Sequence, residues 1–394
     1  MILSVGLILI FGFVIGWLLS KFRIPGLVGM IIVGLIIGPY CLGLIDEKVL
    51  SISTELRQIA LVVIMTRSGL NLDIDSLKKI GRPAILMSFV PATFEIIGVT
   101  LISQLLLDIT ILESVLLGTV LAAVSPAVVS PRMIKLIEER FGENHQVPKL
   151  ILAGSSVDDI YVIVLFYVFL GLVQNNTFDF VSISMIPITI ILGILLGVIV
   201  GLILSYILRK TNFKTPVNIL IILSSSFLMI GLENMLKDYI SISSLLGIMV
   251  MGIVLLFINK EKANELSNGY NNIWIFFEII LFVLVGATVD FNYAINNGLI
   301  AILILVVGLL FRTIGVMICL IKTNLTFKER VFTILAYIPK ATVQASIGGI
   351  ALSLGLSCGS IIITVSVIAI LITAPIGAIL IDNLSDKLLN ISNT

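Results

Sequence analysis

Two adjacent carboxylates, Asp158 and Asp159, interrupt residues 150–164, a run that is otherwise apolar enough to cross a bilayer. An ionisable side chain at bilayer depth costs at least about 2.5–3.5 kcal/mol, so such residues usually have a function. Carboxylate oxygens suit a hard alkali cation, and a buried carboxyl group can also hold a proton near neutral pH. A site that binds either a cation or protons can exchange one for the other. The alternative, a polar loop, fits poorly with the apolar flanks on both sides.

Lys340 is the expected partner of one of these carboxylates. Adjacent residues on a helix point about 100° apart, so Asp158 and Asp159 must have different neighbours. An ammonium group at bilayer depth needs a counter-ion, and Lys340 lies in an apolar segment of the second half of the chain. The other carboxylate would then face a polar cavity. A purely structural Asp–Lys pair is the alternative interpretation.

Proline residues break two apolar segments, at residues 122–131 and 337–344. Proline removes a backbone donor and clashes with the preceding turn. Unwound backbone survives at bilayer depth only where protein covers it or a water-filled cavity reaches it. Hydroxyl and amide side chains in both segments can satisfy the freed backbone groups. The residues predicted at this unwound crossover are Ser125, Pro126, Ser130, Pro339 and Thr342.

Besides Lys340, further charged residues lie within or at the edge of apolar segments: the basic Arg57, Arg67 and Arg312 and the acidic Glu95 and Glu278. Glu95 and Arg312 are predicted to form a buried salt bridge, because an unpaired charge at that depth would be strongly destabilising. Glu278 is either an additional acid of the cavity or a residue near a helix end, and the sequence favours neither interpretation.

The composition indicates a polytopic membrane protein. Of the 394 residues, 59% are hydrophobic and 12% are charged, whereas a soluble domain carries about 25% charged residues. The mean hydropathy is +1.21. The 3 cysteines share no metal-ligand or pairing spacing, the 1 histidine argues against a His-ligated metal, and no Gly-rich nucleotide loop is present. We therefore expect membrane lipid as the environment, no enzymatic activity, no cofactor and no nucleic-acid partner.

Hydropathy divides the chain into about thirteen spans, which predicts an all-α polytopic fold. The predicted spans are residues 1–20, 24–42, 52–70, 83–107, 111–135, 148–173, 182–208, 216–236, 240–258, 272–290, 295–321, 328–354 and 359–383. The third and eighth spans have the weakest patterns.

Charge in the loops predicts the orientation. Most of the 24 Lys and Arg residues lie in alternate loops, among them Lys78 and Lys79, whereas the opposite loops carry only Lys48 and Lys237. Because positive charge is enriched in cytoplasmic loops, we expect the N-terminus outside and the C-terminus in the cytoplasm of a cell whose plasma membrane holds the protein.

Spans 1–6 and 8–13 correspond at an offset of seven, which predicts an inverted repeat. The two proline-broken segments are counterparts in this repeat, and so are the spans that hold Glu95 and Arg312. Breaks at matching positions of an inverted repeat are typical of the binding site of a transporter. The sequence therefore predicts a site where two broken helices cross.

Four strings of residues resemble the cation–proton antiporter superfamily, second branch: LAAVSPAVV at 121–129, AGSSVDDI at 153–160, PKATVQA at 339–345 and ITAPIG at 372–377. The nearest group is that of the Na⁺(Li⁺)/H⁺ antiporters related to the mammalian mitochondrial and sperm-type exchangers and their bacterial Asp-Asp relatives. The resemblance runs from the second span to the end of the chain.

The resemblance implies roles for the charged residues. Asp159 would be the ion-binding carboxylate and the ligand of Na⁺ or Li⁺, and Asp158 would pair with Lys340. Glu95 and Arg312 match a core salt bridge. Glu278 departs from the pattern, because close members of the family carry an amide there.

The resemblance also implies a homodimer of two-domain protomers. Spans 1–3 (residues 1–80) and 8–10 (213–292) would form the dimerisation domain. Spans 4–6 (81–175) and 11–13 (293–394) would form the core, with span 7 (176–212) as linker.

The function predicted from these observations is exchange of Na⁺ or Li⁺ for H⁺ by alternating access, in the service of pH homeostasis. We expect electrogenic exchange: when Na⁺ draws Asp158 away from Lys340, the lysine also releases its proton, and two protons cross for one Na⁺. A K⁺/H⁺ antiporter on the same scaffold and a Na⁺-coupled organic-anion symporter are the alternatives, with a non-transporting receptor more distant.

Overall fold

The computed structural model describes residues 1–72, 80–175, 180–211, 213–236, 240 and 242–390, and these residues form helices and no strand. The all-α fold class is confirmed, and each of the thirteen predicted spans contains helix. In this described part, 9 helices are long and apolar enough to cross a membrane, and two shorter apolar helices accompany them. Lys78, Lys79 and Lys237 lie outside the described residues.

Four predicted spans differ from a single apolar helix. The fourth is divided into α6 (Arg82–Met87) and α7 (Val90–Leu106), and the fifth is divided at the first break into α8 (Ile111–Ala122) and α9 (Pro126–Glu138). The third is α4 (Ser53–Leu70), which is helical but carries Glu55, Arg57 and Arg67 and is therefore less apolar than the others. The twelfth is divided because Pro339 and the residues around it are not helical. Its parts are α16 (Phe327–Ala336), α17 (Thr342–Ile347) and α18 (Ile350–Ser353).

The chain forms two compact units. The first comprises Met1–Thr54, Asp73–Leu170 and Leu281–Thr394. Besides α16–α18 it holds α1 (Ile2–Lys21), α2 (Gly26–Ile37), α3 (Glu47–Ser51), α6 (Arg82–Met87), α7 (Val90–Leu106), α8 (Ile111–Ala122), α9 (Pro126–Glu138), η1 (Glu143–His145), most of α10 (Val147–Asn175), α15 (Phe291–Cys319) and α19 (Gly359–Leu388). The second, Glu55–Leu72 and Gly171–Ile280, holds most of α4, α11 (Phe180–Lys210), α12 (Thr215–Leu236), α13 (Ser244–Ile258) and most of α14 (Lys260–Ala287).

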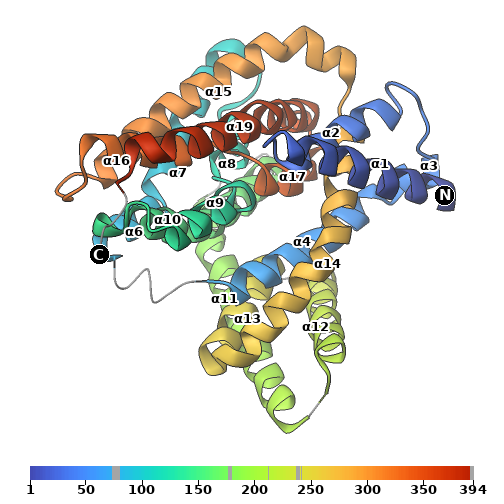
Figure 1. The fold of residues 1–394 in the computed structure, drawn as a ribbon. Helices are drawn as coiled ribbons and strands as arrows, with labels where there is room; N and C mark the ends of the chain where they lie inside the picture. The colour runs from blue at the N-terminus through green and yellow to red at the C-terminus, as the bar shows by residue number, and fades with distance from the viewer. Residues whose placement is uncertain (73–79, 176–179, 212, 237–239, 241, 391–394) are drawn as a thin grey trace. The chain divides into compact units, whose positions relative to one another are not determined.

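Small residues allow the helices of the first unit to approach closely. α7 packs along α15, and α19 packs against α15 and α16 (Figure 1). A Cβ built at Gly98 would lie 2.8 Å from Cβ of Phe311, and one at Gly315 would lie 2.8 Å from Cα of Pro91. Membrane helices associate through such close packing because lipid offers no hydrophobic drive between them.

The second unit is built in the same way. α11 packs along α13. A Cβ built at Gly197 would lie 2.9 Å from Cα of Gly247 on the facing helix. The close approach of α11 and α13 therefore requires small residues on both sides.

Two capping boxes anchor the broken helices at the ends that lie away from their breaks. Thr110 and Glu113 cap the start of α8, and Thr326 and Glu329 cap the start of α16. Each glutamate also contacts the loop that follows the other broken helix. Oε1 of Glu113 accepts a hydrogen bond from Ser357 at 2.5 Å, and Oε1 of Glu329 lies 2.9 Å from Nδ1 of His145. The two broken helices are thus tied together at their ends as well as at their centres.

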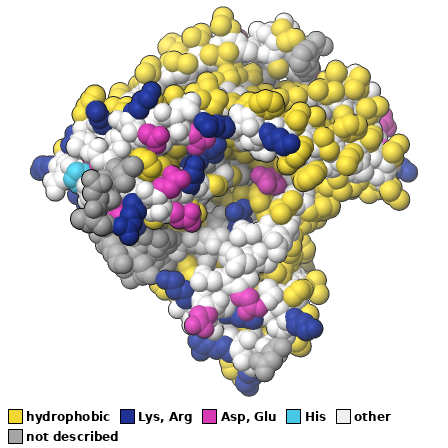
Figure 2. All heavy atoms as spheres, viewed as in Figure 1, with side chains coloured by type: hydrophobic (Ala, Val, Ile, Leu, Met, Phe, Trp, Pro, Cys, Tyr) yellow, Lys and Arg dark blue, Asp and Glu magenta, His cyan; other side chains and the backbone are white. Residues whose placement is uncertain are grey.

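Hydrophobic side chains cover wide parts of the surface. On the face drawn in Figure 2, the area over α1 and α2 is almost wholly hydrophobic, whereas charged side chains gather in separate groups. On α1, the exposed residues include Ile10, Phe13 and Trp17. An apolar outer surface of this kind suits a protein whose surroundings are lipid.

Candidate functional site

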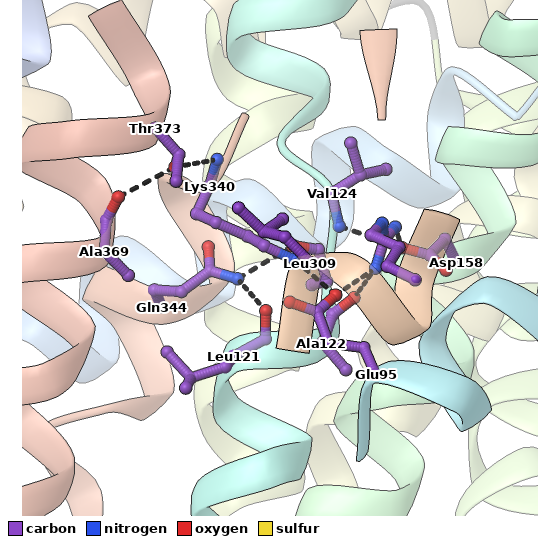
Figure 3. Close-up of polar contacts among 12 residues, drawn as sticks. Glu95, Leu121, Ala122, Val124, Asp158, Leu309, Lys340, Gln344, Ala369 and Thr373 are labelled. Atoms are coloured by element: carbon purple, nitrogen blue, oxygen red, sulfur yellow. Dashed lines mark hydrogen bonds and ion pairs between the residues drawn. The ribbon is translucent and has the colours of Figure 1, made fainter. Parts of the chain in front are cut away.

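The two breaks cross in the first unit and are hydrogen-bonded to each other. The backbone N–H of Ser125 donates to the carbonyl of Pro339 at 2.8 Å. Nε2 of Gln344 donates to the carbonyls of Ala123 at 2.8 Å and Leu121 at 3.3 Å, the last of which lies in the final turn of α8 (Figure 3). Backbone groups that each break leaves without a helical partner are therefore satisfied by the other break.

Side chains satisfy the backbone of the second break. The amide oxygen of Gln344 accepts the N–H of Ala341 at 2.8 Å, and the hydroxyl of Thr373 on α19 accepts the N–H of Lys340 at 2.9 Å. All four residues are buried. This meets the requirement that buried backbone donors find a partner.

Four buried charged residues form a continuous ladder across the crossing point (Figure 3). Nζ of Lys340 lies 2.6 Å from Oε2 of Glu95, and Nη1 of Arg312 lies 2.6 Å from the same oxygen. Nη2 of Arg312 lies 3.1 Å from Oδ2 of Asp158. The two cations and two anions are compensated within the ladder.

Arg312 and Asp158 also bind the first break. Arg312 donates to the carbonyl of Ala122 at the end of α8, where a cation is favoured by the helix dipole. The N–H of Val124 donates to Oδ2 of Asp158 at 2.8 Å. The guanidinium of Arg312 lies 5.3 Å from the ring centroid of Tyr337, in cation–π contact. The ladder therefore fixes the unwound backbone and is fixed by it.

The structure places Glu95 and Arg312 in contact, as the sequence predicts, but Lys340 contacts Glu95 and not Asp158. The reason is the forked guanidinium of Arg312, which reaches both carboxylates at once. Nζ of Lys340 and Nη1 of Arg312 share Oε2 of Glu95, whereas Oε1 of Glu95 and Oδ1 of Asp158 have no hydrogen-bond partner among the described residues.

Asp159 takes no part in the ladder. It is buried, and within the described part of the chain it has no ion pair, while its Oδ1 has no hydrogen-bond partner. The neighbouring Asp158 holds both a cation and a backbone donor. The predicted divergence of the two side chains on one helix is thus visible in their contacts.

The predicted crossover residues lie at or near the breaks. Ser125 is the N-cap residue of α9, and its buried hydroxyl oxygen has no hydrogen-bond partner among the described residues. Pro126 opens α9 and Thr342 opens α17, whereas Pro339 lies in the unwound stretch between α16 and α17. Pro126 occupies the first position of α9, where proline favours the start of a helix. Ser130 therefore lies inside α9, one turn beyond the break.

Glu278 belongs to the second unit. It lies on α14, half-buried, and interacts electrostatically with Arg67 of α4. The same unit holds the buried Arg57. Two of the four basic residues found inside apolar segments thus lie on α4, and the other two, Arg312 and Lys340, lie in the ladder.

Two contributors to the site, Thr373 and Tyr337, have no role in the sequence-based prediction. Thr373 belongs to the string at 372–377 that carries the resemblance, but the resemblance assigns no role to this residue. Tyr337 adjoins the second break, where an aromatic ring beside a cation could have been anticipated.

A model of the family described as "Sodium/hydrogen exchanger, transmembrane" matches residues 7–384 of the chain. The chain belongs to the sodium/hydrogen exchanger family. It is 32% identical over 388 residues to sodium/hydrogen exchanger 9B2 of Homo sapiens, a match that covers 93% of this chain and 70% of the relative. Sodium/hydrogen exchanger 9B1 of Mus musculus is 32% identical over 391 residues, with 93% and 66% covered.

A solved structure shows the same fold as this exchanger-family chain. The sodium proton antiporter MjNhaP1 from Methanocaldococcus jannaschii at pH 8 superposes with a TM-score of 0.84 and 21% identity, over 98% of each chain. A second structure of that protein superposes with a TM-score of 0.75. The fold with crossing broken helices is therefore that of a known antiporter.

Proposed function

We propose that this chain exchanges Na⁺ for H⁺ across a membrane by alternating access, with Asp159 binding the cation and the proton in turn. One observation carries the proposal: Asp159 is a buried carboxylate without an ion pair in the described part of the chain, beside an Asp158 whose Oδ2 is held by Arg312 and by the N–H of Val124. The names of the relatives, sodium/hydrogen exchangers, support Na⁺ over the alternative cargoes.

Competition follows from the electrostatics of a buried carboxylate. An ionised carboxylate without a partner is costly in a low-dielectric site, and either a proton or a cation removes that cost. Because one carboxylate accommodates one of the two at a time, loading Na⁺ displaces H⁺. The buried hydroxyl of Ser125, next to the Val124 that binds Asp158, is a further hard oxygen suited to an alkali cation.

The charge ladder has a different task in this proposal. Arg312 holds Glu95 and Asp158 in fixed positions, and Lys340 completes the ladder. Breaking one buried pair strands the other charge, so the ladder holds the broken helices in register in this conformation. No cofactor is needed for this chemistry.

The assembly and orientation complete the proposal. We assign residues 81–175 and 293–394 to a core domain, 1–80 and 213–292 to a dimerisation domain and 176–212 to the linker, in a homodimer. The protein would lie in the plasma membrane with its N-terminus outside, supported by the distribution of basic residues among the loops.

Proteoliposomes with an internal pH dye test the proposal. The purified chain is challenged in turn with Na⁺, Li⁺, K⁺ and an organic anion, with protein-free liposomes as control. We expect Na⁺ and Li⁺ to move protons and the other two to have no effect. Proton movement driven by K⁺ alone, or uptake of the organic anion with Na⁺, would contradict the proposal.

A further inference from the structure

The string at residues 372–377 lies on α19, directly behind the second break. Oγ1 of Thr373 accepts the backbone N–H of Lys340 at 2.9 Å and donates to the carbonyl of Ala369 at 2.7 Å (Figure 3). Thr373 and Lys340 are both buried. The hydroxyl of Thr373 therefore links α19 to the backbone of Lys340.

Gly377, one turn further along α19, makes a second contact with the same break. A Cβ built at Gly377 would lie 2.8 Å from Cδ of Pro339 and nearer still to its Cγ. A proline ring cannot rotate away from such an atom, so any side chain at this position would displace Pro339. The carbonyl of Pro339 accepts the N–H of Ser125, and a displacement would therefore reach the first break as well.

The side chain of Lys340 extends from the backbone that these two contacts hold. Its Nζ lies 2.6 Å from Glu95, in a ladder where every charge depends on its neighbour. Both residues that make these contacts, Thr373 and Gly377, lie on α19, which is a continuous helix from Gly359 to Leu388. We infer that Thr373 and Gly377 are positioning residues for ion exchange, which set where the Lys340 ammonium lies relative to the carboxylates.

This inference rests on the proposed function, and the hydroxyl is its critical group. Lys340 has left the helix, so its buried N–H needs an acceptor from elsewhere. Valine has the shape of threonine but offers no acceptor, and an orphaned buried donor is strongly unfavourable. The backbone of Lys340 would then move to find another partner, and the ammonium would move with it.

The test compares four variants of the full chain in proteoliposomes: Thr373→Val, Thr373→Ser, Gly377→Ala and, as a matched control, Thr364→Val. Thr364 is a buried threonine of the same helix, nine residues before Thr373 in the sequence. Na⁺-driven proton movement is measured over a series of pH values and Na⁺ concentrations. Thermal melting in detergent is recorded for each variant.

We expect Thr373→Val to reduce the maximal exchange rate about tenfold, the effect of leaving one buried donor unsatisfied. It should also displace the pH profile of exchange, because the ammonium no longer occupies its place among the carboxylates. Thr373→Ser retains the acceptor and should restore both the rate and the profile, and Thr364→Val should match the wild type. Gly377→Ala, which displaces Pro339 directly, should shift the pH profile in the same direction.

Three results would overturn the inference. A Thr373→Val variant with the wild-type rate and profile would show that the hydroxyl positions nothing. A loss that lowers the melting temperature, leaves the shape of the pH profile unchanged and is not restored by serine would show a purely structural role. If the wild-type chain moved no protons in response to Na⁺, the proposed function would fail, and this inference with it.

Discussion

Asp158 and Asp159 differ by one position on α10, yet among the described residues only Asp158 has cationic and backbone donors as partners. Oδ2 of Asp158 is thus held by Arg312 and by the first break in this conformation. Asp159 lacks such partners in the described part of the chain. At the scale of single residues, we therefore assign anchoring to Asp158 and propose ion binding for Asp159.

Replacing Asp159 with asparagine should abolish Na⁺-driven proton movement without unfolding the protein. The amide leaves no anionic ligand and no titratable group, while a neutral polar side chain costs little in a polar site. Asp386→Asn, at an exposed position of α19, serves as the matched control and should exchange normally. An Asp159→Asn variant that exchanges at the wild-type rate in liposomes would show that another group binds the ion.

The pair Glu95–Arg312 should show strong coupling in a double-mutant cycle. Each single change to alanine strands a buried charge, at about 3–5 kcal/mol: Glu95→Ala strands Lys340, and Arg312→Ala strands Asp158. The double change instead leaves one cation and one anion, Lys340 and Asp158, whose charges balance, so it should cost less than the sum of the two single changes. Melting temperatures of the four proteins in detergent measure the coupling, and strict additivity would contradict it.

At the scale of elements, the breaks could be predicted from sequence and their contacts could not. Proline at 126 and 339 disfavours a continuous helix, so both interruptions agree with local chemistry, although Pro131 and Pro375 lie inside helices. The partner of Lys340 depends instead on the contacts that Arg312 makes with two carboxylates, Glu95 and Asp158. Three-dimensional packing determines those contacts. Hydropathy and spacing place a residue on a span but do not rank its neighbours across the core.

The helix caps were predictable but have a tertiary role that was not. Thr110 with Glu113 and Thr326 with Glu329 follow the Thr-x-x-Glu pattern of a capping box. The pattern accounts for the starts of α8 and α16. It does not indicate that Glu329 also contacts His145, because that residue lies far away in the sequence.

Removal of a capping glutamate should therefore destabilise the protein by more than a surface change would. Glu329→Ala loses a helix cap worth about 1 kcal/mol and the contact with His145. We expect the melting temperature to fall by at least about 2–4 °C. Glu139→Ala, which removes only an exposed partner of Lys135, is the control and should leave the melting temperature unchanged. Equal melting temperatures for both variants would contradict the anchoring role.

At the scale of the whole molecule, the cysteines allow the orientation to be tested without adding a label. Cys41 is exposed, between α2 and α3, whereas Cys319 and Cys358 are buried. With the N-terminus outside, two spans return the chain to the outer face, and Cys41 lies there. A membrane-impermeant maleimide should therefore label intact cells that produce the protein.

Two controls complete the labelling experiment. Cys41→Ser should remove the signal, and Lys387→Cys in that background should be labelled only after the membrane is permeabilised. Labelling of Lys387→Cys in intact cells, together with labelling of Cys41 only after the membrane is permeabilised, would reverse the proposed orientation.

Charge stoichiometry is a property of the whole transport cycle, and the structure defines what an electrogenic cycle requires. In the two-proton scheme Lys340 loses its counter-ion when Na⁺ enters, and it then releases its proton. In the described conformation Lys340 contacts Glu95, which Arg312 also holds. The scheme therefore needs a second conformation in which the ammonium leaves Glu95 for Asp158 and is stranded when Na⁺ draws Asp158 away.

We expect this second conformation to occur, so that each cycle moves one net charge, driven by about 2.3 kcal/mol for each 100 mV. A potential set with K⁺ and valinomycin across proteoliposomes should then change the exchange rate and its reversal point. Lys340→Arg keeps the charge but cannot release a proton, so any exchange that this variant retains should be indifferent to voltage. If the wild-type rate were itself indifferent, the Lys340–Glu95 pair would persist through the cycle, and one proton would cross for each Na⁺.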